Sequence, residues 1–298
     1  MLNFQDCQNI VNHKINELKL PDFPSNLYDP VRYMLNLEAK RVRPCIVLMA
    51  CNVFSDAIDN AIYPALAIEV FHNFTLIHDD LMDKSDLRRN HATVHKKWNP
   101  DIAVLSGDAM LIKAYELLSD APHSVLPGIL PVFNRTALEV CEGQQYDMDF
   151  EKSLDVSIDD YLTMIEFKTA VLLAASLKIG AIAGGAGDEQ SESLYRFGRD
   201  LGIAFQLQDD WLDVFSDARV FGKVTGNDIV TNKKTILLIE ALNNATGKIR
   251  TELLHWLNLD NFDREEKITV IRSIYQQLGI DMRVKERVRT YHQKAIQH

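Results

Sequence analysis

Two stretches of the sequence carry aspartates at the same spacing. DDLMD occupies residues 79–83 and DDWLD occupies residues 209–213, each at the end of an apolar stretch. If these stretches are helical, Asp79 and Asp83 have Cβ atoms about 5–6 Å apart and could share one cation. Asp80 lies about 100° round such a helix and should face elsewhere. One such motif could be a solvated helix face, but two of them within hydrophobic sequence favour metal binding.

We therefore expect metal ligands among five aspartates, namely Asp79, Asp83, Asp209, Asp210 and Asp213. Direct contact is expected from Asp79, Asp83 and Asp209. The second aspartate of each motif, together with Asp213, is expected mostly to support these ligands. Magnesium suits this donor set, because it is a hard ion that prefers carboxylate, phosphate and water oxygens at about 2.0–2.1 Å.

Basic side chains occur where they could bind phosphate. Lys40 and Arg43 come just before Pro44, which suits the first turn of a helix, and a helix N-terminus attracts anions. From this stretch alone, an ordinary basic loop is the preferred interpretation. Lys168 and Thr169 lie where the polar part of a long amphipathic stretch ends, and a lysine in such a place normally reaches the solvent.

A glycine-containing basic segment follows the second aspartate motif. It reads GKVTGNDIVTNKK and includes Lys223, Asp228 and Lys233. Taken alone, such a segment is a weak sign of phosphate binding. Residues 246–298 show repeated amphipathic helices without a cluster of reactive residues, and we expect them to be scaffold.

The residues that precede the first aspartate motif include one histidine and two phenylalanines. His72 lies two helical turns before Asp79 on nearly the same face. A lone histidine on an apolar face is more often a core residue, and we do not expect it to bind metal. Phe71 and Phe74, at i and i+3, could form a core pair or line a cavity. Phe205, just before the second motif, could likewise pack in the core or present its ring face to a cation or substrate.

Helices must position these residues, because strand signals are nearly absent. The sequence has no sustained alternation of apolar and polar residues and no Asn-Gly hairpin between β-branched runs. Its 298 residues could build one large helical core, and no linker interrupts them. We expect an all-α fold in a single domain, residues 1–298. About ten or more helices would surround a deep central cavity, with the two aspartate motifs on facing helices.

Composition excludes some classes of function. The net charge of −10 argues against a nucleic-acid partner, and an anionic substrate would need metal ions as intermediaries. Four cysteines without a CxxC pair indicate free thiols in a reducing cytoplasm. No stretch reaches the roughly 18 uninterrupted apolar residues of a spanning helix, and the first residues lack the apolar core of a signal peptide. We expect a cytoplasmic protein without a transmembrane segment.

Several motifs together resemble those of the trans-isoprenyl diphosphate synthases, the polyprenyl synthetase family. In order they are EAKRVRP at residues 38–44, DDLMD followed by Arg88 and Arg89, GQQYDMDFE at 143–151, Lys168 with Thr169, FQLQDDWLD at 205–213 and GKVTGNDIVTNKKT at 222–235. The resemblance covers nearly the whole chain. It implies the isoprenoid synthase fold, a helical bundle around a central cavity.

The resemblance also implies a reaction. Isopentenyl diphosphate would be joined head-to-tail to an allylic diphosphate, either dimethylallyl, geranyl or farnesyl, with release of diphosphate. The allylic C–O bond would ionise, the isopentenyl double bond would attack the cation, and the released diphosphate would accept the proton. The family further implies three Mg²⁺ ions, with Mn²⁺ as a substitute, and a homodimer.

The resemblance assigns the basic residues to two substrates. Those for isopentenyl diphosphate are Lys40, Arg43, His72 and Arg89. Those for the allylic diphosphate are Arg88, Lys168, Lys223 and Lys233. Arg88 and Arg89 would point about 100° apart on a helix, which would let them bind different anions. Two departures from the family are Glu38-Ala39, where two glycines usually stand, and Asn90, where glycine is common.

Other residues are assigned to the chemistry itself. The resemblance makes the following residues catalytic: Asp79, Asp80, Asp83, Lys168, Thr169, Gln206 and Asp209. The backbone carbonyl near Lys168, with Thr169 and Gln206, would stabilise the carbocation, while Gln144 and Asp147 would support the polar network. Phe71 and Phe74 would limit the growing tail to C15–C20, with geranylgeranyl slightly favoured over farnesyl.

Two other functions remain as alternatives. A terpene cyclase shares the first aspartate motif and the helical fold, but its second metal motif usually contains Asn, Ser or Thr and Glu instead of DDWLD. A one-substrate cyclase also has no use for the cluster of Lys40, Arg43 and Arg89. A regulatory subunit of a heteromeric synthase typically loses an aspartate motif, whereas this chain has both.

Overall fold

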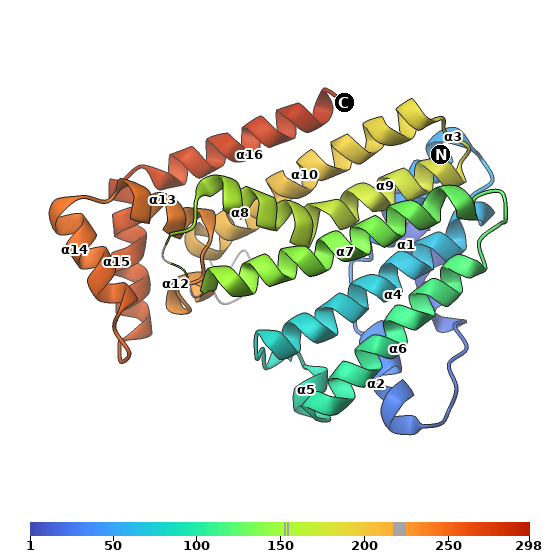
Figure 1. The fold of residues 1–298 in the computed structure, drawn as a ribbon, viewed down its shortest axis with the longest axis horizontal. Coiled ribbons are helices and arrows are strands. Elements are labelled where there is room, and N and C mark those ends of the chain that lie inside the picture. The colour runs from blue at the N-terminus through green and yellow to red at the C-terminus, as the bar shows by residue number, and fades with distance from the viewer. Residues whose placement is uncertain (152, 154, 217–224) are drawn as a thin grey trace. The chain divides into compact units, whose positions relative to one another are not determined.

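The computed structural model describes residues 1–151, 153, 155–216 and 225–298, and helices make up most of it (Figure 1). The elements are α1 Phe4–Asn16, α2 Ser25–Asn36, α3 Val42–Phe54, α4 Asp59–Met82, β1 Leu87–Arg88, β2 His91–Ala92, α5 Val94–Lys97, α6 Pro100–Ser119, α7 Leu126–Glu151, α8 Ile158–Ile165, a π-helical turn η1 Glu166–Ala170, α9 Val171–Ala183, α10 Asp188–Phe215, α12 Asn227–Val230, α13 Ile236–Asn244, α14 Gly247–Leu257, α15 Arg264–Gln277 and α16 Ile280–Ile296. The predicted all-α class is confirmed.

Contacts divide the chain into two compact units. Unit 1 comprises residues 1–135 and 175–195, and unit 2 comprises residues 136–174 and 196–298. Helices α7, α9 and α10 each contribute residues to both units. The single domain, the central cavity and the facing aspartate motifs expected from the sequence stay predictions.

Unit 1 is built around α4, which is apolar on nearly every side and largely buried. It packs most extensively on α6 (Figure 1) and next on α3. Asn99 is the N-cap of helix α6, because its side chain accepts a hydrogen bond from the Ile102 amide. Pro100 occupies the first position of the helix, where proline is favoured. Gly107 of α6 lies so close to α4 that a Cβ there would fall 2.2 Å from Nε2 of His78. The lack of a side chain at Gly107 therefore leaves room for the His78 ring between the two helices.

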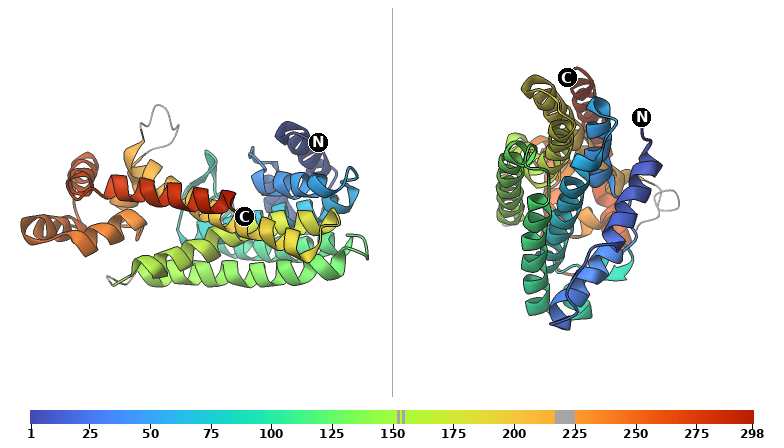
Figure 2. Two further views of the ribbon diagram at one scale, coloured as in Figure 1. Left: turned by 90° about the horizontal axis from the view of Figure 1, so that it is seen from above. Right: turned by 90° about the vertical axis from the view of Figure 1, so that its right-hand side faces the viewer.

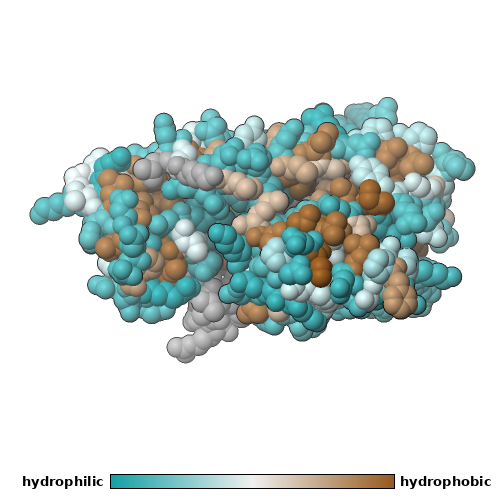
Figure 3. All heavy atoms as spheres, turned by 60° about the horizontal axis from the view of Figure 1, so that its bottom comes forward, coloured by the Kyte–Doolittle hydropathy of each residue, from teal (hydrophilic) through white to brown (hydrophobic). Residues whose placement is uncertain are grey.

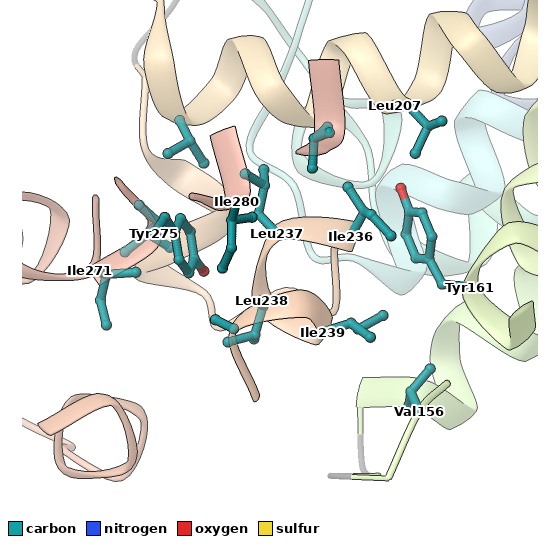
Figure 4. Close-up of a cluster of buried hydrophobic side chains, with 14 of the residues drawn as sticks. Val156, Tyr161, Leu207, Ile236, Leu237, Leu238, Ile239, Ile271, Tyr275 and Ile280 are labelled. Atoms are coloured by element: carbon teal, nitrogen blue, oxygen red, sulfur yellow. The ribbon is translucent and has the colours of Figure 1, made fainter. Parts of the chain in front are cut away.

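Unit 2 has a hydrophobic core formed by α8, α13, α15, α16 and the later part of α10. Figure 4 shows part of it, with Tyr161, Leu207, Ile236 and Tyr275 among the buried side chains. Helix α16 runs antiparallel to α10 (Figures 1 and 2). Lys285 Nζ lies 4.2 Å from the centre of a Trp211 ring, and beyond the end of α16 the His298 Nε2 atom is 3.0 Å from Asp200 Oδ2.

One face of the surface is shown by residue hydropathy in Figure 3. Hydrophilic residues predominate on the face seen in Figure 3, and apolar residues gather in smaller patches. Among the residues described, every helix falls short of the length and hydrophobicity that crossing a membrane would require.

Candidate functional site

The first aspartate motif lies at the C-terminal end of α4 in unit 1. The amide of Asp83 donates to the carbonyl of Asp79 at 2.8 Å, so the two residues are one helical turn apart as predicted. Asp80 turns inward and is only 1% exposed. Its Oδ1 accepts hydrogen bonds from Arg88 Nε at 3.0 Å and from Arg88 Nη2 at 2.5 Å. Burial raises the pKa of Asp80, and the hydrogen bond from Arg88 partly offsets that rise.

Arg88 and Arg89 lie in a β-hairpin, so the prediction that they share a helix is wrong. Arg88 ends β1, which pairs antiparallel with β2, and Arg89 and Asn90 form the two-residue turn with φ of 53° and 63°. A turn with two positive φ angles matches the right-handed twist of the strands it joins. Asparagine tolerates this conformation, which explains how Asn90 replaces the glycine common in the family. The turn, and not a helix, separates the two guanidinium groups.

A basic cluster in unit 1 contains Arg43, His72 and Arg89. Arg43 Nη1 lies 3.2 Å from His72 Nε2. Burial, then the positive charges of Arg43 and Arg89, hold the pKa of His72 well below its usual range. Because a guanidinium can only donate, the neutral imidazole accepts through Nε2 and carries its proton on Nδ1.

Two donors of this cluster have no protein acceptor. Arg43 Nε and Arg89 Nη1 are buried without a hydrogen-bond partner in the part of the chain that the structure describes. Buried donors are normally paired, so these two atoms and the imidazole form a site suited to an anion. Lys40 is exposed, and its carbonyl accepts a hydrogen bond from Gln8 Nε2 at 3.1 Å.

A buried ion pair that the sequence analysis missed supports the basic cluster. Arg41, the N-cap of α3, has a φ of 53° and donates through Nη1 to Glu69 Oε1 at 2.5 Å. Its Nη2 donates to the Leu35 carbonyl, also at 2.5 Å. Asn73 Nδ2 donates to the same Glu69 oxygen at 2.9 Å. The pair fixes the backbone just before Arg43. The sequence feature that could have indicated this ion pair is Glu69, a charged residue within the apolar sequence of α4.

The second aspartate motif lies on α10 in unit 2, again in helical register. Both carboxylate oxygens of Asp210 are engaged, one by the hydroxyl of buried Tyr161 and the other by Gln206 Nε2 at 3.0 Å. Burial raises the pKa of Asp210 to about 6. One oxygen of Asp213 accepts the Asp228 amide at 3.0 Å. These bonds leave Asp209 as the member of the motif best suited to direct metal contact. Tyr161 gave no sequence signal.

Lys168 and Thr169 lie in the π-helical turn η1, where the helix expected from the sequence is wound wider. Such turns are frequent at functional sites. Lys168 Nζ donates to Asp147 Oδ2 at 2.6 Å, and Thr169 Oγ1 donates to Gln206 Oε1 at 3.1 Å. These two contacts link Lys168 to Asp147 and Thr169 to Gln206 within unit 2, and the supporting role assigned to Asp147 stays a prediction. The role assigned to Gln144 stays a prediction.

Two glycines allow neighbouring helices to approach η1 closely. A Cβ on Gly143 of α7 would lie 2.2 Å from the Lys168 nitrogen, and one on Gly202 of α10 would lie 2.6 Å from the Ala170 Cα. Both distances are below any normal Cβ contact. The π-helical turn is thus held by backbone on two sides.

The basic segment after the second motif is described only in part. Lys223 lies outside the described residues. Asp228 is in α12, and burial raises its pKa to about 7. The positive charge of Lys233 lowers the pKa values of both Asp210 and Asp228. Lys233 is therefore close to the carboxylates of unit 2.

The sequence matches the family model named polyprenyl synthetase over residues 24–278. The chain belongs to this family. A geranylgeranyl diphosphate synthase from Methanosarcina mazei is 43% identical over 234 residues, covering 78% of this chain and 72% of that protein. A geranylfarnesyl diphosphate synthase from Natronomonas pharaonis is 41% identical over 250 residues, covering 78% and 73%. This polyprenyl synthetase is therefore a prenyltransferase, as the motifs predicted.

Solved structures share its fold. A geranylgeranyl pyrophosphate synthase superimposes with a TM-score of 0.94 at 42% identity, covering 100% of this chain and 92% of that one. A geranylgeranyl pyrophosphate synthase from Corynebacterium glutamicum, solved with isoprenyl diphosphate and magnesium, has a TM-score of 0.88 at 26% identity, covering 100% and 93%. The predicted isoprenoid synthase fold is confirmed.

Replacing Glu69 with leucine should destabilise the protein by about 3–5 kcal/mol, because Arg41 would then be buried without its counter-charge. The double variant Arg41→Met/Glu69→Leu should recover much of this loss, since it buries no unpaired charge. Urea unfolding measures both. If Glu69→Leu unfolds like the unmodified protein, the ion pair does not support the basic cluster.

Gly143→Ala should lower kcat about 100-fold, because the added Cβ must push the Lys168 backbone out of place and a displacement of about 1 Å can cost that much. Gly187→Ala is the matched control, since the nearest atom to its Cβ would be 3.8 Å away. Steady-state rates and circular dichroism distinguish lost geometry from lost fold. Equal rates in the two variants would show that the close contact is dispensable.

Proposed function

We propose that this polyprenyl synthetase condenses isopentenyl diphosphate with an allylic diphosphate, head-to-tail, to make geranylgeranyl diphosphate. The observation that carries the proposal is that the chain contains two different sets of anion-binding residues as well as two intact aspartate motifs. Arg43, His72 and Arg89 offer donors without metal ligands among them. Lys168 is paired instead with Asp147, and both lysines, Lys168 and Lys233, line one pocket with Asp210 of the second motif. This division suits one substrate bound by protein alone and one bound with metal.

Divalent metal ions serve diphosphate binding in this family, and we propose three Mg²⁺ ions here, with Mn²⁺ as a substitute. The donors fit, because carboxylates, phosphates and water are the ligands that Mg²⁺ prefers. No group of three or more His, Cys, Asp or Glu side chains, within the residues described, is arranged to hold a metal by itself. Mg²⁺ needs only one or two carboxylates when substrate phosphates complete its shell. Asp79, Asp83 and Asp209 would be the direct ligands, and bound metal would neutralise charge on the leaving diphosphate.

The proposed mechanism uses the residues of each unit in distinct ways. Arg88, Lys168 and Lys233 would bind the allylic diphosphate and stabilise the negative charge that develops as its C–O bond breaks. Lys223 is proposed to join them from outside the described residues. The backbone carbonyl near Lys168, with the oxygens of Thr169 and Gln206, would face the carbocation. Isopentenyl diphosphate would receive a hydrogen bond from Nδ1 of neutral His72, and the released diphosphate would take the final proton.

The two alternatives are less well supported. A cyclase has one substrate and would leave the donors of Arg43 and Arg89 without a purpose. A regulatory subunit would need neither motif intact, yet the aspartates of both motifs are in helical register. The relatives described above are named as synthases.

A turnover assay tests the proposal. Purified protein with isopentenyl diphosphate, an allylic diphosphate and Mg²⁺ should release diphosphate, and Asp79→Ala and Asp209→Ala should each lower the rate at least about 100-fold. Asp188→Ala, on the same helix as Asp209 but in its first turn, should not. A silent unmodified protein would favour the regulatory subunit, and near-normal rates in both aspartate variants would refute the ligand assignment.

We propose that aromatic rings on α4 set the product length. Phe71 and Phe74 are both buried, with ring centres 5.5 Å apart, and they continue a series of ring contacts within unit 1. Phe74 contacts His78 at 4.8 Å and Phe71 contacts Phe133 at 5.2 Å. At about 1.5 Å per residue, Phe74 and Phe71 lie roughly 7–8 and 12 Å before Asp79 along the helix. Rings at these depths would stop the tail after a few isoprene units, and the relatives named geranylgeranyl and geranylfarnesyl diphosphate synthase favour C20 over C15.

Phe74→Ala, alone or with Phe71→Ala, should lengthen the product by at least one isoprene unit, because the rings would no longer block the tail. Chromatography of the dephosphorylated products gives the length. The Michaelis constant for isopentenyl diphosphate serves as the control and should change little. If the products keep the same length, these rings form only a core pair.

We also propose that the protein is a homodimer of the cytoplasm. The four cysteines are free thiols, as a reducing compartment requires. Leu105 and Ile112, two turns apart on α6, are 59% and 67% exposed and give this helix an apolar outer face. Sedimentation should therefore show a dimer, and Leu105→Lys/Ile112→Lys should weaken it. A monomer near 34 kDa at micromolar concentration would contradict the proposal.

A further inference from the structure

Lys267 of α15 is a fully buried lysine in the region expected from the sequence to be scaffold. Its relative exposure is 0%. Nζ donates to Asn232 Oδ1 at 2.8 Å and to the Val230 carbonyl at 3.4 Å, and it lies 4.0 Å from the centre of the Phe262 ring. Its hydrogen-bond acceptors among the described residues are an amide oxygen and a backbone carbonyl, both of them neutral. The lysine is thus satisfied by two neutral oxygens and an aromatic face.

Such an arrangement is costly for packing alone. Burying a cation without a counter-charge is unfavourable, and an apolar side chain of similar size would fill the same space without that penalty. Burial accordingly lowers the pKa of Lys267. Its two hydrogen bonds must therefore contribute something that an apolar residue would not, namely a fixed position for the segment they hold.

That segment is the turn between α12 and α13. Asn232 has a φ of 55°, a left-handed conformation that few residues other than glycine adopt freely. Its side chain connects two elements, since Oδ1 accepts from Lys267 while Nδ2 donates to the Leu257 carbonyl at 3.0 Å. Asparagine tolerates this conformation, and Asn232 is held in it by hydrogen bonds at both ends of its side-chain amide.

The residue after Asn232 is Lys233. The Lys233 amide donates to the Asp228 carbonyl at 2.9 Å, and the Asp228 amide donates to Asp213 Oδ2 at 3.0 Å. The segment is therefore attached to the second aspartate motif at one end and to Lys267 at the other. Any rotation at Asn232 would redirect the side chain of Lys233 relative to the carboxylates of α10.

We propose that Lys267 and Asn232 are positioning residues that direct Lys233 toward the allylic diphosphate. This role rests on the proposed function, because it takes the diphosphate to be the group that Lys233 binds. Lys267 would not touch the substrate. It would act only by holding the turn, so it should influence one substrate and not the other.

Two variants remove, one at a time, the donor and the acceptor of the Lys267–Asn232 hydrogen bond. Lys267→Met keeps the volume and removes the donors, while Asn232→Gly keeps the positive φ and removes the acceptor. Each should raise the Michaelis constant for the allylic diphosphate about 10-fold and leave that for isopentenyl diphosphate within 2-fold. The effects in the double variant should add up to less than the sum of the two single effects, because both changes remove the Lys267–Asn232 hydrogen bond, while each also removes one bond of its own, to the Leu257 carbonyl or to the Val230 carbonyl. Lys285→Met, which loses a lysine lying over the Trp211 ring of the same unit, should change neither constant.

Binding of inorganic diphosphate with Mg²⁺, measured by calorimetry, keeps the test independent of turnover. Lys267→Met and Asn232→Gly should each weaken it about 10-fold relative to the unmodified protein, whether or not the assay for condensation succeeds. Diphosphate affinity equal to that of the unmodified protein, in variants that remain folded by circular dichroism, would overturn the inference. A parallel rise in both Michaelis constants would also overturn it, since that is the result of general destabilisation.

Discussion

Helix α4 is largely buried among apolar neighbours, and the polar side chains on its buried part must therefore find partners inside the protein. Glu69 binds Arg41, Asn73 binds Glu69, and His72 lies against Arg43. At the end of the helix, Asp80 binds Arg88. An unpaired buried charge at Glu69 or Asp80 would be strongly unfavourable, and so would an unpaired polar group at His72 or Asn73. The same helix thus recruits three arginines from other segments.

In unit 2, a buried carboxylate is satisfied by neutral hydrogen-bond donors and not by an ion pair alone. The buried carboxylate of Asp210 is held by a phenol and an amide, and the amide is in turn held by Thr169. Neutral donors leave the carboxylate's charge in place, which suits the metal binding proposed for this motif. The two clusters accordingly differ in net character, one being rich in guanidinium and the other in carboxylate.

Sequence patterns predicted the features that depend on local periodicity. The helical class, the register of both aspartate motifs and the closeness of Arg43 to His72 follow from spacing and from family motifs. The hairpin at Arg89 was not predicted, because positive φ at Arg89 and Asn90 lacks the usual Asn-Gly signature. Tyr161 and Lys267 were also missed. Each acts on a residue distant in sequence, and neither belongs to a recognisable motif.

The hairpin after α4 also constrains how this region can vary. The Ser85 amide donates to the Asp80 carbonyl at 2.9 Å, and Thr93 Oγ1 donates to the Ser85 carbonyl at 2.8 Å. The residues on both sides of the hairpin, Ser85 and Thr93, are therefore attached close to the end of α4. A two-residue turn fixes the strand register on either side of it. An inserted or deleted residue between these attachments would move Arg88 off Asp80, so variation in this segment should proceed by substitution at constant length.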